Sequence, residues 1–139
     1  MQSDKKKSQG GFSLVELIVS IAVVAILGAL VLQLFVSAEV LNRKAGDIDK
    51  SISISVAAIE LYRGGVSPEN FSEYGDFGKA AREGGLVVFY YGDKWVHTDN
   101  ADCEYVLTFD AEKMYAKVEK VNAYPMQEKH PVLLYEING

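Results

Sequence analysis

The fold is decided by residues 5–28, KKKSQGGFSLVELIVSIAVVAILG. Three lysines and a glycine pair precede a long apolar run, and Glu16 is the one ionisable side chain from Phe12 to Val36. At about 1.5 Å of rise per residue, a helix over these 25 residues crosses the roughly 30 Å hydrocarbon core of a membrane. A carboxylate in that core costs about 2.5–3.5 kcal/mol, so we expect Glu16 to have a specific partner.

This arrangement resembles the amino terminus of type IV prepilins and of the related pseudopilins of type II secretion. The resemblance rests on the lysines of the leader and on Gly-Phe-Ser-Leu-Val-Glu-Leu before an apolar helix. It implies that a prepilin peptidase cuts after Gly11 and methylates the new terminal residue, Phe12. A secretory signal peptide is cut after its apolar segment, whereas this cut precedes the segment, so the mature protein keeps it. The leader charge of Lys5, Lys6 and Lys7 favours the cytoplasmic side and places the carboxy-terminal head outside.

Glu16 has two interpretations. Once Gly11 is removed, the Phe12 amine lies four residues before Glu16 on the same helix face, so the two charges can pair within one chain. The carboxylate can instead meet the Phe12 amine of a neighbouring subunit, which would drive docking and fix the axial register of a filament. The charges leave both open, and the family resemblance implies the intersubunit pair.

Small side chains along the apolar helix suit close packing in a filament core, because they let helix backbones approach each other. They are Ala22, Ala25, Gly28 and Ala29. The major subunits of the family often carry a helix-breaking glycine and proline where this chain has Ala25 and Gln33. We therefore expect an unbroken helix and a minor subunit.

The sequence predicts four segments. They are a leader at 1–11, a transmembrane and filament-core helix at 12–36, an amphipathic continuation of the helix at 37–63, and a head at 64–139. An apolar stripe at three- and four-residue spacing supports the continuation. Its members are Val36, Val40, Ala45, Ile48, Ile52, Val56 and Ile59. Residues 51–56 alternate and also fit a strand, but the stripe runs through them, and Arg63-Gly64-Gly65 is a helix stop.

The head begins with a loop and then, from Pro68 to Arg82, a short helical connection that Glu83-Gly84-Gly85 ends. Strand-like runs follow at 86–91, 95–98, 104–110, 114–121 and 132–137. Short turns join the first four into an antiparallel meander, and a loop between Pro125 and Pro131 precedes the last. The expected fold is α+β, with a long amino-terminal helix packed on a small antiparallel sheet. The family resemblance implies the same architecture.

The head is acidic. Residues 64–139 hold 7 Lys and Arg against 13 Asp and Glu, a formal charge of −6. A surface of this sign repels phosphate backbones, so we expect no nucleic-acid partner. The head is also near the size at which burial is marginal, so we expect the helix to complete its core.

Asp99, Asp102 and Glu104 form an acidic loop that could bind Ca²⁺, since hard cations prefer oxygen ligands. Their spacing matches no strong calcium-loop pattern, so we interpret them as solvated charge. His97 and His130 are ordinary side chains, because neither has a partner at metal-ligand spacing.

Cys103 is the single cysteine, so no internal disulfide forms, and we expect a buried or half-buried thiol. Tyr90, Tyr91 and Trp95 surround a tight turn and are interpreted as hairpin packing rather than as a ligand platform. The sequence shows no nucleophile set, phosphate loop or carboxylate pair. We therefore predict neither an enzyme nor a cofactor.

We expect a structural, minor subunit of a type IV pilus. The alternatives are a minor pseudopilin of type II secretion or a competence-pilus subunit and, in a different class, an uncleaved single-pass protein whose head binds a ligand. The implied partners are a prepilin peptidase, an inner-membrane platform protein, sister pilins in the filament, and membrane lipid before assembly. The expected location is the cytoplasmic membrane with the head outside, and afterwards a pilus or pseudopilus at the cell surface or in the periplasm.

Overall fold

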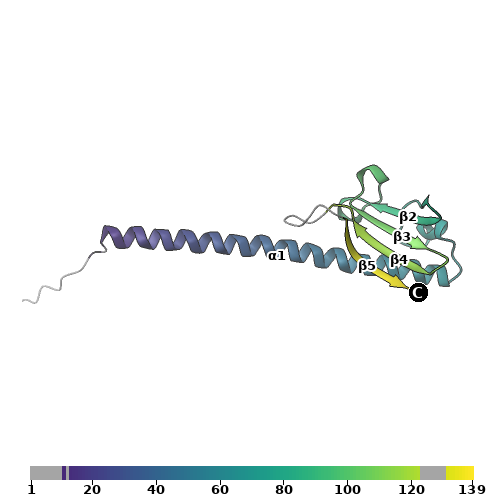
Figure 1. The fold of residues 1–139 in the computed structure, drawn as a ribbon, viewed down its shortest axis with the longest axis horizontal. Helices are drawn as coiled ribbons and strands as arrows, with labels where there is room; N and C mark the ends of the chain where they lie inside the picture. The colour runs from purple at the N-terminus through teal and green to yellow at the C-terminus, as the bar shows by residue number, and fades with distance from the viewer. Residues whose placement is uncertain (1–10, 12, 123–130) are drawn as a thin grey trace, which may run out of the picture. The chain divides into compact units, whose positions relative to one another are not determined.

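The computed structural model describes residues 11, 13–122 and 131–139. These residues form two units, divided between Glu39 and Val40. One helix, α1 (Leu14–Arg63), contributes to both. The other elements are η1 (Pro68–Glu73), β1 (Ala81–Glu83), β2 (Leu86–Tyr91), η2 (Asp93–Trp95), η3 (Asn100–Asp102), β3 (Tyr105–Asp110), β4 (Tyr115–Lys120) and β5 (Val132–Asn138) (Figure 1). The fold is α+β, as the sequence predicts.

The first unit consists of the amino-terminal part of α1. Every residue from Leu14 to Glu39 is exposed. An 18-residue window of the helix has a mean hydropathy of 2.8 and is 0% buried, so among the described residues α1 is long and apolar enough to cross a membrane. Apolar side chains without a protein covering are stable in lipid or against other helices, and not in water.

The helix continues without a break through residues 51–56, which confirms the prediction of helix there. It ends in a Schellman motif. The Val66 N–H donates to the Leu61 carbonyl at 3.0 Å, and the Gly65 N–H donates to the Tyr62 carbonyl at 3.0 Å. Gly65 has φ +86°, a conformation that glycine adopts without a Cβ penalty. The predicted stop at Arg63-Gly64-Gly65 is therefore confirmed.

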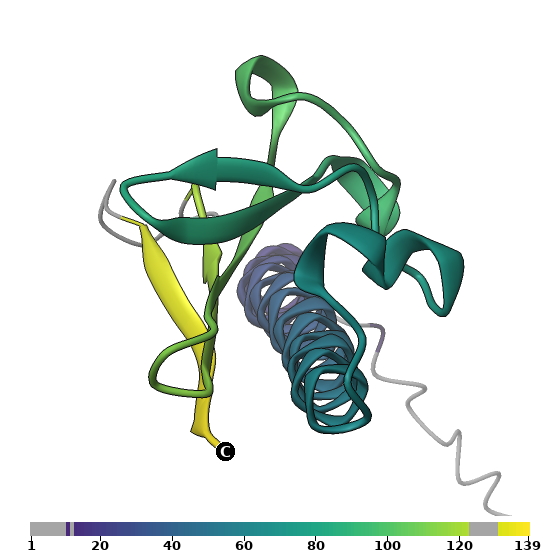
Figure 2. The ribbon, with the colours of Figure 1, turned by 90° about the vertical axis from the view of Figure 1, so that its right-hand side faces the viewer.

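The second unit contains a five-stranded antiparallel sheet in the order β1-β2-β3-β4-β5, a simple meander (Figure 1). Its inner face packs on the carboxy-terminal part of α1, which Figure 2 shows nearly end-on beside the strands. Buried residues alternate along β3 and β4, as a half-covered sheet requires. The strands predicted at 86–91, 104–110, 114–121 and 132–137 are present within one residue at each end. Pro125 lies outside the described residues.

The helix face against the sheet differs from the predicted stripe. The buried helix residues are Asp47, Ser51, Ile54, Ser55, Ala58 and Ile59. Ile52, which the stripe places inside, is 37% exposed. Small side chains at 51, 55 and 58, each 0% exposed, take the central positions because they let the helix backbone approach the large aromatic residues of the sheet.

Two other expectations for the head are wrong. The predicted helical connection from Pro68 to Arg82 ends at Glu73, and residues 81–83 instead form β1, which pairs with β2. Gly84 and Gly85 have φ +57° and +87°, and they form the tight hairpin turn between these strands. The predicted strand at 95–98 is absent and is replaced by η2 and one isolated bridge between Tyr91 and His97.

Candidate functional site

The amino-terminal motif begins in the structure at Gly11. This residue is exposed, and a Cβ built on it meets no described atom within 4 Å. No described part of the chain therefore covers Gly11 itself. Phe12, Lys5, Lys6 and Lys7 lie outside the described residues, so their predicted roles remain predictions.

Ser13 and Glu16 form a reciprocal cap at the start of α1. The Glu16 N–H donates to the Ser13 hydroxyl at 3.2 Å, and the Ser13 N–H donates to the Glu16 carboxylate at 3.4 Å. This is a capping box, in which a serine before the helix and a glutamate three residues later each satisfy a backbone donor. The Ser-x-x-Glu spacing of Ser13 and Glu16 is a sequence signal for this arrangement and would have predicted the cap.

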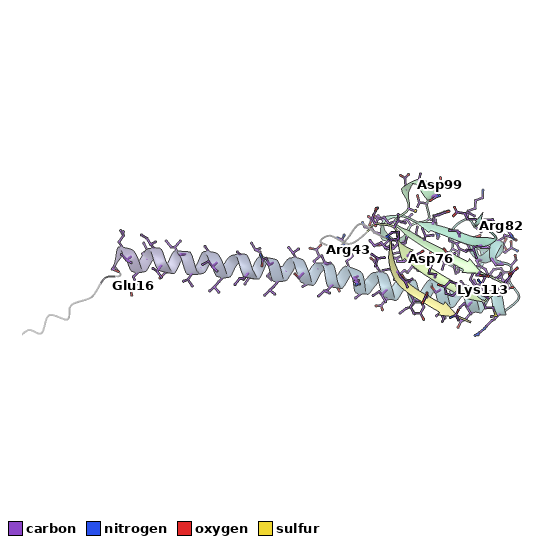
Figure 3. All side chains as sticks on the ribbon, viewed as in Figure 1. Glu16, Arg43, Asp76, Arg82, Asp99 and Lys113 are labelled. Atoms are coloured by element: carbon purple, nitrogen blue, oxygen red, sulfur yellow. The ribbon has the colours of Figure 1, made fainter. Side chains whose placement is uncertain are left out.

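The Glu16 carboxylate is exposed, and Figure 3 shows it at the amino-terminal end of the helix. Within the described part of the chain, the carboxylate receives one N–H, from Ser13, which is fewer than its acceptor lone pairs. The carboxylate is therefore able to accept a hydrogen bond from a further donor. An ammonium donor would also neutralise its negative charge. The helix surface that follows is apolar, and a Cβ built on Gly28 meets no described atom within 4 Å.

In the second unit, a buried polar cluster joins α1 to the sheet. Tyr105 donates to the Asp47 carboxylate at 2.9 Å and accepts from the Lys120 ammonium at 2.9 Å. The Lys120 ammonium lies 3.5 Å from Asp47 and 3.6 Å from Glu104. The side chains of Asp47 and Lys120 are each 8% exposed. Buried charges need this kind of pairing, because a buried charge without its partner loses its hydration with no compensating interaction.

Aromatic stacking completes the cluster. The Trp95 ring lies 4.1 Å from the Tyr105 ring at 14°, and the Lys120 ammonium lies 4.4 Å from the centroid of Tyr105. The Trp95 indole also donates to Asp47 at 3.4 Å. Burial raises the pKa of Tyr105, and the hydrogen bond to Asp47 raises it further. No sequence pattern joins Asp47 to Tyr105 and Lys120, which come from distant parts of the chain.

The acidic loop gives no metal centre. Asp99 and Asp102 are exposed, whereas Glu104 is half-buried and pairs with Lys120. Within the described ranges there is no group of three or more His, Cys, Asp or Glu side chains that could hold a metal ion. Figure 3 shows Asp99 at the tip of its loop.

His97 pairs with Asp76, its Nε2 lying 3.4 Å from the carboxylate, and Asp76 also accepts from Lys50 at 2.5 Å. His130 lies outside the described residues. The ring of Tyr91 lies 5.7 Å from that of Trp95, in agreement with aromatic packing near the turn.

Tyr90 is buried and donates to Glu83 across the first hairpin. Cys103 is half-buried, and burial raises the pKa of its thiol. A raised pKa lowers the thiolate fraction and so disfavours nucleophilic reactivity of this thiol.

The comparisons with known proteins identify the amino-terminal segment. The family model for the prokaryotic N-terminal methylation motif matches residues 6–32. No curated protein and no solved structure matches the chain. The motif is characteristic of the precursors of type IV pilins and pseudopilins, so the predicted resemblance is confirmed.

Proposed function

We propose that this prepilin-type chain is a structural, minor subunit of a type IV pilus. It is cleaved after Gly11, methylated at Phe12 and assembled through α1. The match to the methylation motif over residues 6–32 carries the proposal. The apolar, uncovered helix supports it, because such a helix is suited to a membrane and then to a filament core. Gly11 supports it as well, because no described residue covers it and a peptidase needs an uncovered glycine there.

Assembly replaces lipid around the helices by other helices. The Glu16 carboxylate then meets the methylated amine of a neighbouring Phe12, and each charge lowers the cost of placing the other in an apolar surrounding. The partners are a prepilin peptidase, an inner-membrane platform protein and sister pilins. A minor pseudopilin of type II secretion or a competence-pilus subunit would share these features. A subunit of a surface pilus would appear in long surface filaments, whereas these alternatives would appear in a short periplasmic or wall-spanning filament.

Cleavage is tested by the intact mass of the membrane-extracted protein. We expect the loss of residues 1–11 and the gain of one methyl group. Gly11→Val should keep the whole leader, because a branched side chain hinders the extended peptide in the peptidase, whereas Gly28→Val lies beyond the cut and should be processed normally. A chain that retains Met1 in cells with an active peptidase would be an uncleaved anchor.

The role of Glu16 is tested by Glu16→Gln. Glutamine also serves in a capping box, so this variant keeps the cap and removes the charge. We expect normal membrane insertion and cleavage, together with at least a tenfold loss of incorporation into filaments, since about 1.4 kcal/mol corresponds to a factor of ten. Normal incorporation of Glu16→Gln would contradict the pairing.

A further inference from the structure

A polar pocket lies where the buried cluster reaches the surface of the second unit. It has a volume of about 440 Å³. Its lining residues are Arg43, Asp47, Asp93, Lys94, Trp95, Glu104, Tyr105 and Lys120. Figure 3 labels Arg43 on α1 at this side of the unit. Three cations and three anions therefore surround one cavity, which suits a ligand that carries both signs of charge.

Lys94 and Asp93 stand at the rim of the pocket, and both are exposed. Neither forms a salt bridge with any residue of the described ranges. A phosphate could reach Lys94, and an ammonium could reach the carboxylate of Asp93. The other charges deeper in the pocket, Asp47 and Lys120, already bind each other and Tyr105.

The backbone at the rim is held in an unusual conformation. Lys94 has φ 55° and Trp95 has φ 63°, so two successive non-glycine residues are left-handed. This conformation is unfavourable for such residues and persists where surrounding contacts fix it, often at binding sites. Here the contact is the stacking of Trp95 on Tyr105, which holds Lys94 at the mouth of the pocket.

The pocket is also close along the chain to the apolar segment. Arg43 follows Val36 by seven residues in α1, which is about 10 Å on a helix. Even fully extended, seven residues span at most about 25 Å. A chain that leaves the hydrocarbon at Val36 therefore keeps Arg43 near the polar headgroup layer, which is roughly 5–8 Å thick. Tryptophan, tyrosine and basic side chains are also the residues that favour this layer.

We infer that the pocket binds the headgroup of a zwitterionic phospholipid that carries a phosphate and a primary ammonium, with Lys94 on the phosphate and Asp93 on the ammonium. The inference rests on the membrane anchorage in the proposed function and on neither cleavage nor assembly. It identifies a place where the unassembled subunit recognises the lipid around it.

Trp95 is the only tryptophan of the chain and lines the pocket, so its fluorescence reports directly on the site. The full-length protein in micelles of a neutral detergent is titrated with short-chain phosphatidylethanolamine, short-chain phosphatidylglycerol, glycerophosphoethanolamine and inorganic phosphate. We expect a saturable change with phosphatidylethanolamine. Lys94→Gln should weaken it roughly fivefold, the loss of one charge-assisted contact at an exposed rim. The matched control is Lys113→Gln in the β3–β4 turn, which should bind as the unmodified chain does.

An equal response to phosphatidylglycerol or to phosphate would replace the zwitterion site by a simple anion site and overturn the inference. Tighter binding of glycerophosphoethanolamine than of phosphatidylethanolamine would identify the ligand as a soluble zwitterion and would overturn the lipid assignment. Equal weakening by Lys94→Gln and Lys113→Gln, or the absence of any saturable change, would also refute the site. The titration uses unassembled protein, so a failure of the filament assay with Glu16→Gln leaves its result unaffected.

Discussion

Glu16 carries two separable properties, the cap that it shares with Ser13 and its negative charge. In the precursor, the cap fixes the first turn of α1. In a filament, the charge would select the terminus of a neighbour. Two substitutions therefore separate the charge of Glu16 from the cap, since Glu16→Gln removes the charge and Ser13→Ala removes the hydroxyl acceptor of the cap.

Ser13→Ala should weaken the start of the helix by about 1 kcal/mol, the usual cost of losing such a cap. Faster hydrogen exchange of the Glu16 amide would report it. Filaments should still form, because the carboxylate remains. Ser20→Ala removes a hydroxyl that donates to the Glu16 carbonyl and serves as the control. If Ser13→Ala abolished assembly as fully as Glu16→Gln, the cap rather than the charge would be essential.

Lys120 is the buried cation of the helix-to-sheet cluster. Lys120→Ala should lower the free energy of unfolding of the head by about 3 kcal/mol, because Asp47 stays buried without its ion pair. Denaturant unfolding followed by Trp95 fluorescence measures this. Lys117→Ala on the same strand removes a half-exposed pair with Glu119 and should cost less than about 1 kcal/mol. Equal losses would mean that the cluster contributes no more than surface charge.

Alkaline pH should destabilise the head. Burial raises the pKa of Tyr90 and Tyr115 to about 12, from 10.0, and raises the pKa of Tyr105. A raised folded-state pKa means that the folded protein holds these protons more tightly, so its stability is complete below pH 10 and falls as the pH rises from about 10 toward 12. The unfolding free energy measured across this interval should decrease. Tyr105→Phe should make the decrease shallower, and Tyr74→Phe, which changes an exposed ring, is the matched control.

At the scale of elements, the contact between α1 and the sheet depends on small helix residues. Ser55 is 0% exposed, and its hydroxyl has no hydrogen-bond partner within the described part of the chain. Ser55→Ala should therefore stabilise the head by about 0.5–1 kcal/mol, since it removes an unsatisfied polar group and improves helix propensity. Ser53→Ala, on the exposed side of the helix, is the control, because it improves helix propensity without removing a buried polar group. Denaturant unfolding compares the two, and a loss of stability in Ser55→Ala would contradict the assignment.

The elements differ in how far their sequence predicts them. The long helix is a continuous apolar and then amphipathic segment with a clear stop, and strands β2 to β5 are apolar or alternating runs bounded by turn residues, so their existence follows from local sequence. Strand β1, at Ala81-Arg82-Glu83, lacks β-branched and aromatic residues, and it exists because the Gly84-Gly85 turn folds it onto β2. The predicted strand from Trp95 fails because its ring stacks on Tyr105, a contact that comes from the tertiary fold.

The site shows the same division. Gly11 and Glu16 are recognised from contiguous sequence, and the Ser13 cap could have been recognised as well. The cluster of Asp47, Tyr105 and Lys120 joins residues up to 73 positions apart in the chain. It depends on the strand register that sets Tyr105 opposite Lys120, which no local pattern predicts. An inward-facing Asp47 also explains the displaced stripe, since a charged residue on the buried face contradicts the hydrophobic pattern.

At the scale of the whole molecule, the division at residue 39/40 predicts an independent head. A chain of residues 40–139 should remain soluble and monomeric, because it lacks the exposed apolar part of α1. Its unfolding free energy should lie within about 1 kcal/mol of the full chain in detergent, since the core cluster lies within this range. Denaturant titration and sedimentation would measure these properties. A large loss of stability would show that the head depends on the preceding helix.

The small side chains at Ser51, Ser55 and Ala58 have a consequence for where this fold can accept substitutions. These three side chains are fully buried between the helix and the sheet, so larger side chains at these positions would clash with the sheet. The outward residues of β3 and β4, such as Thr108, Lys117 and Glu119, carry no such constraint. The same scaffold can thus carry very different chemistries on its outer side.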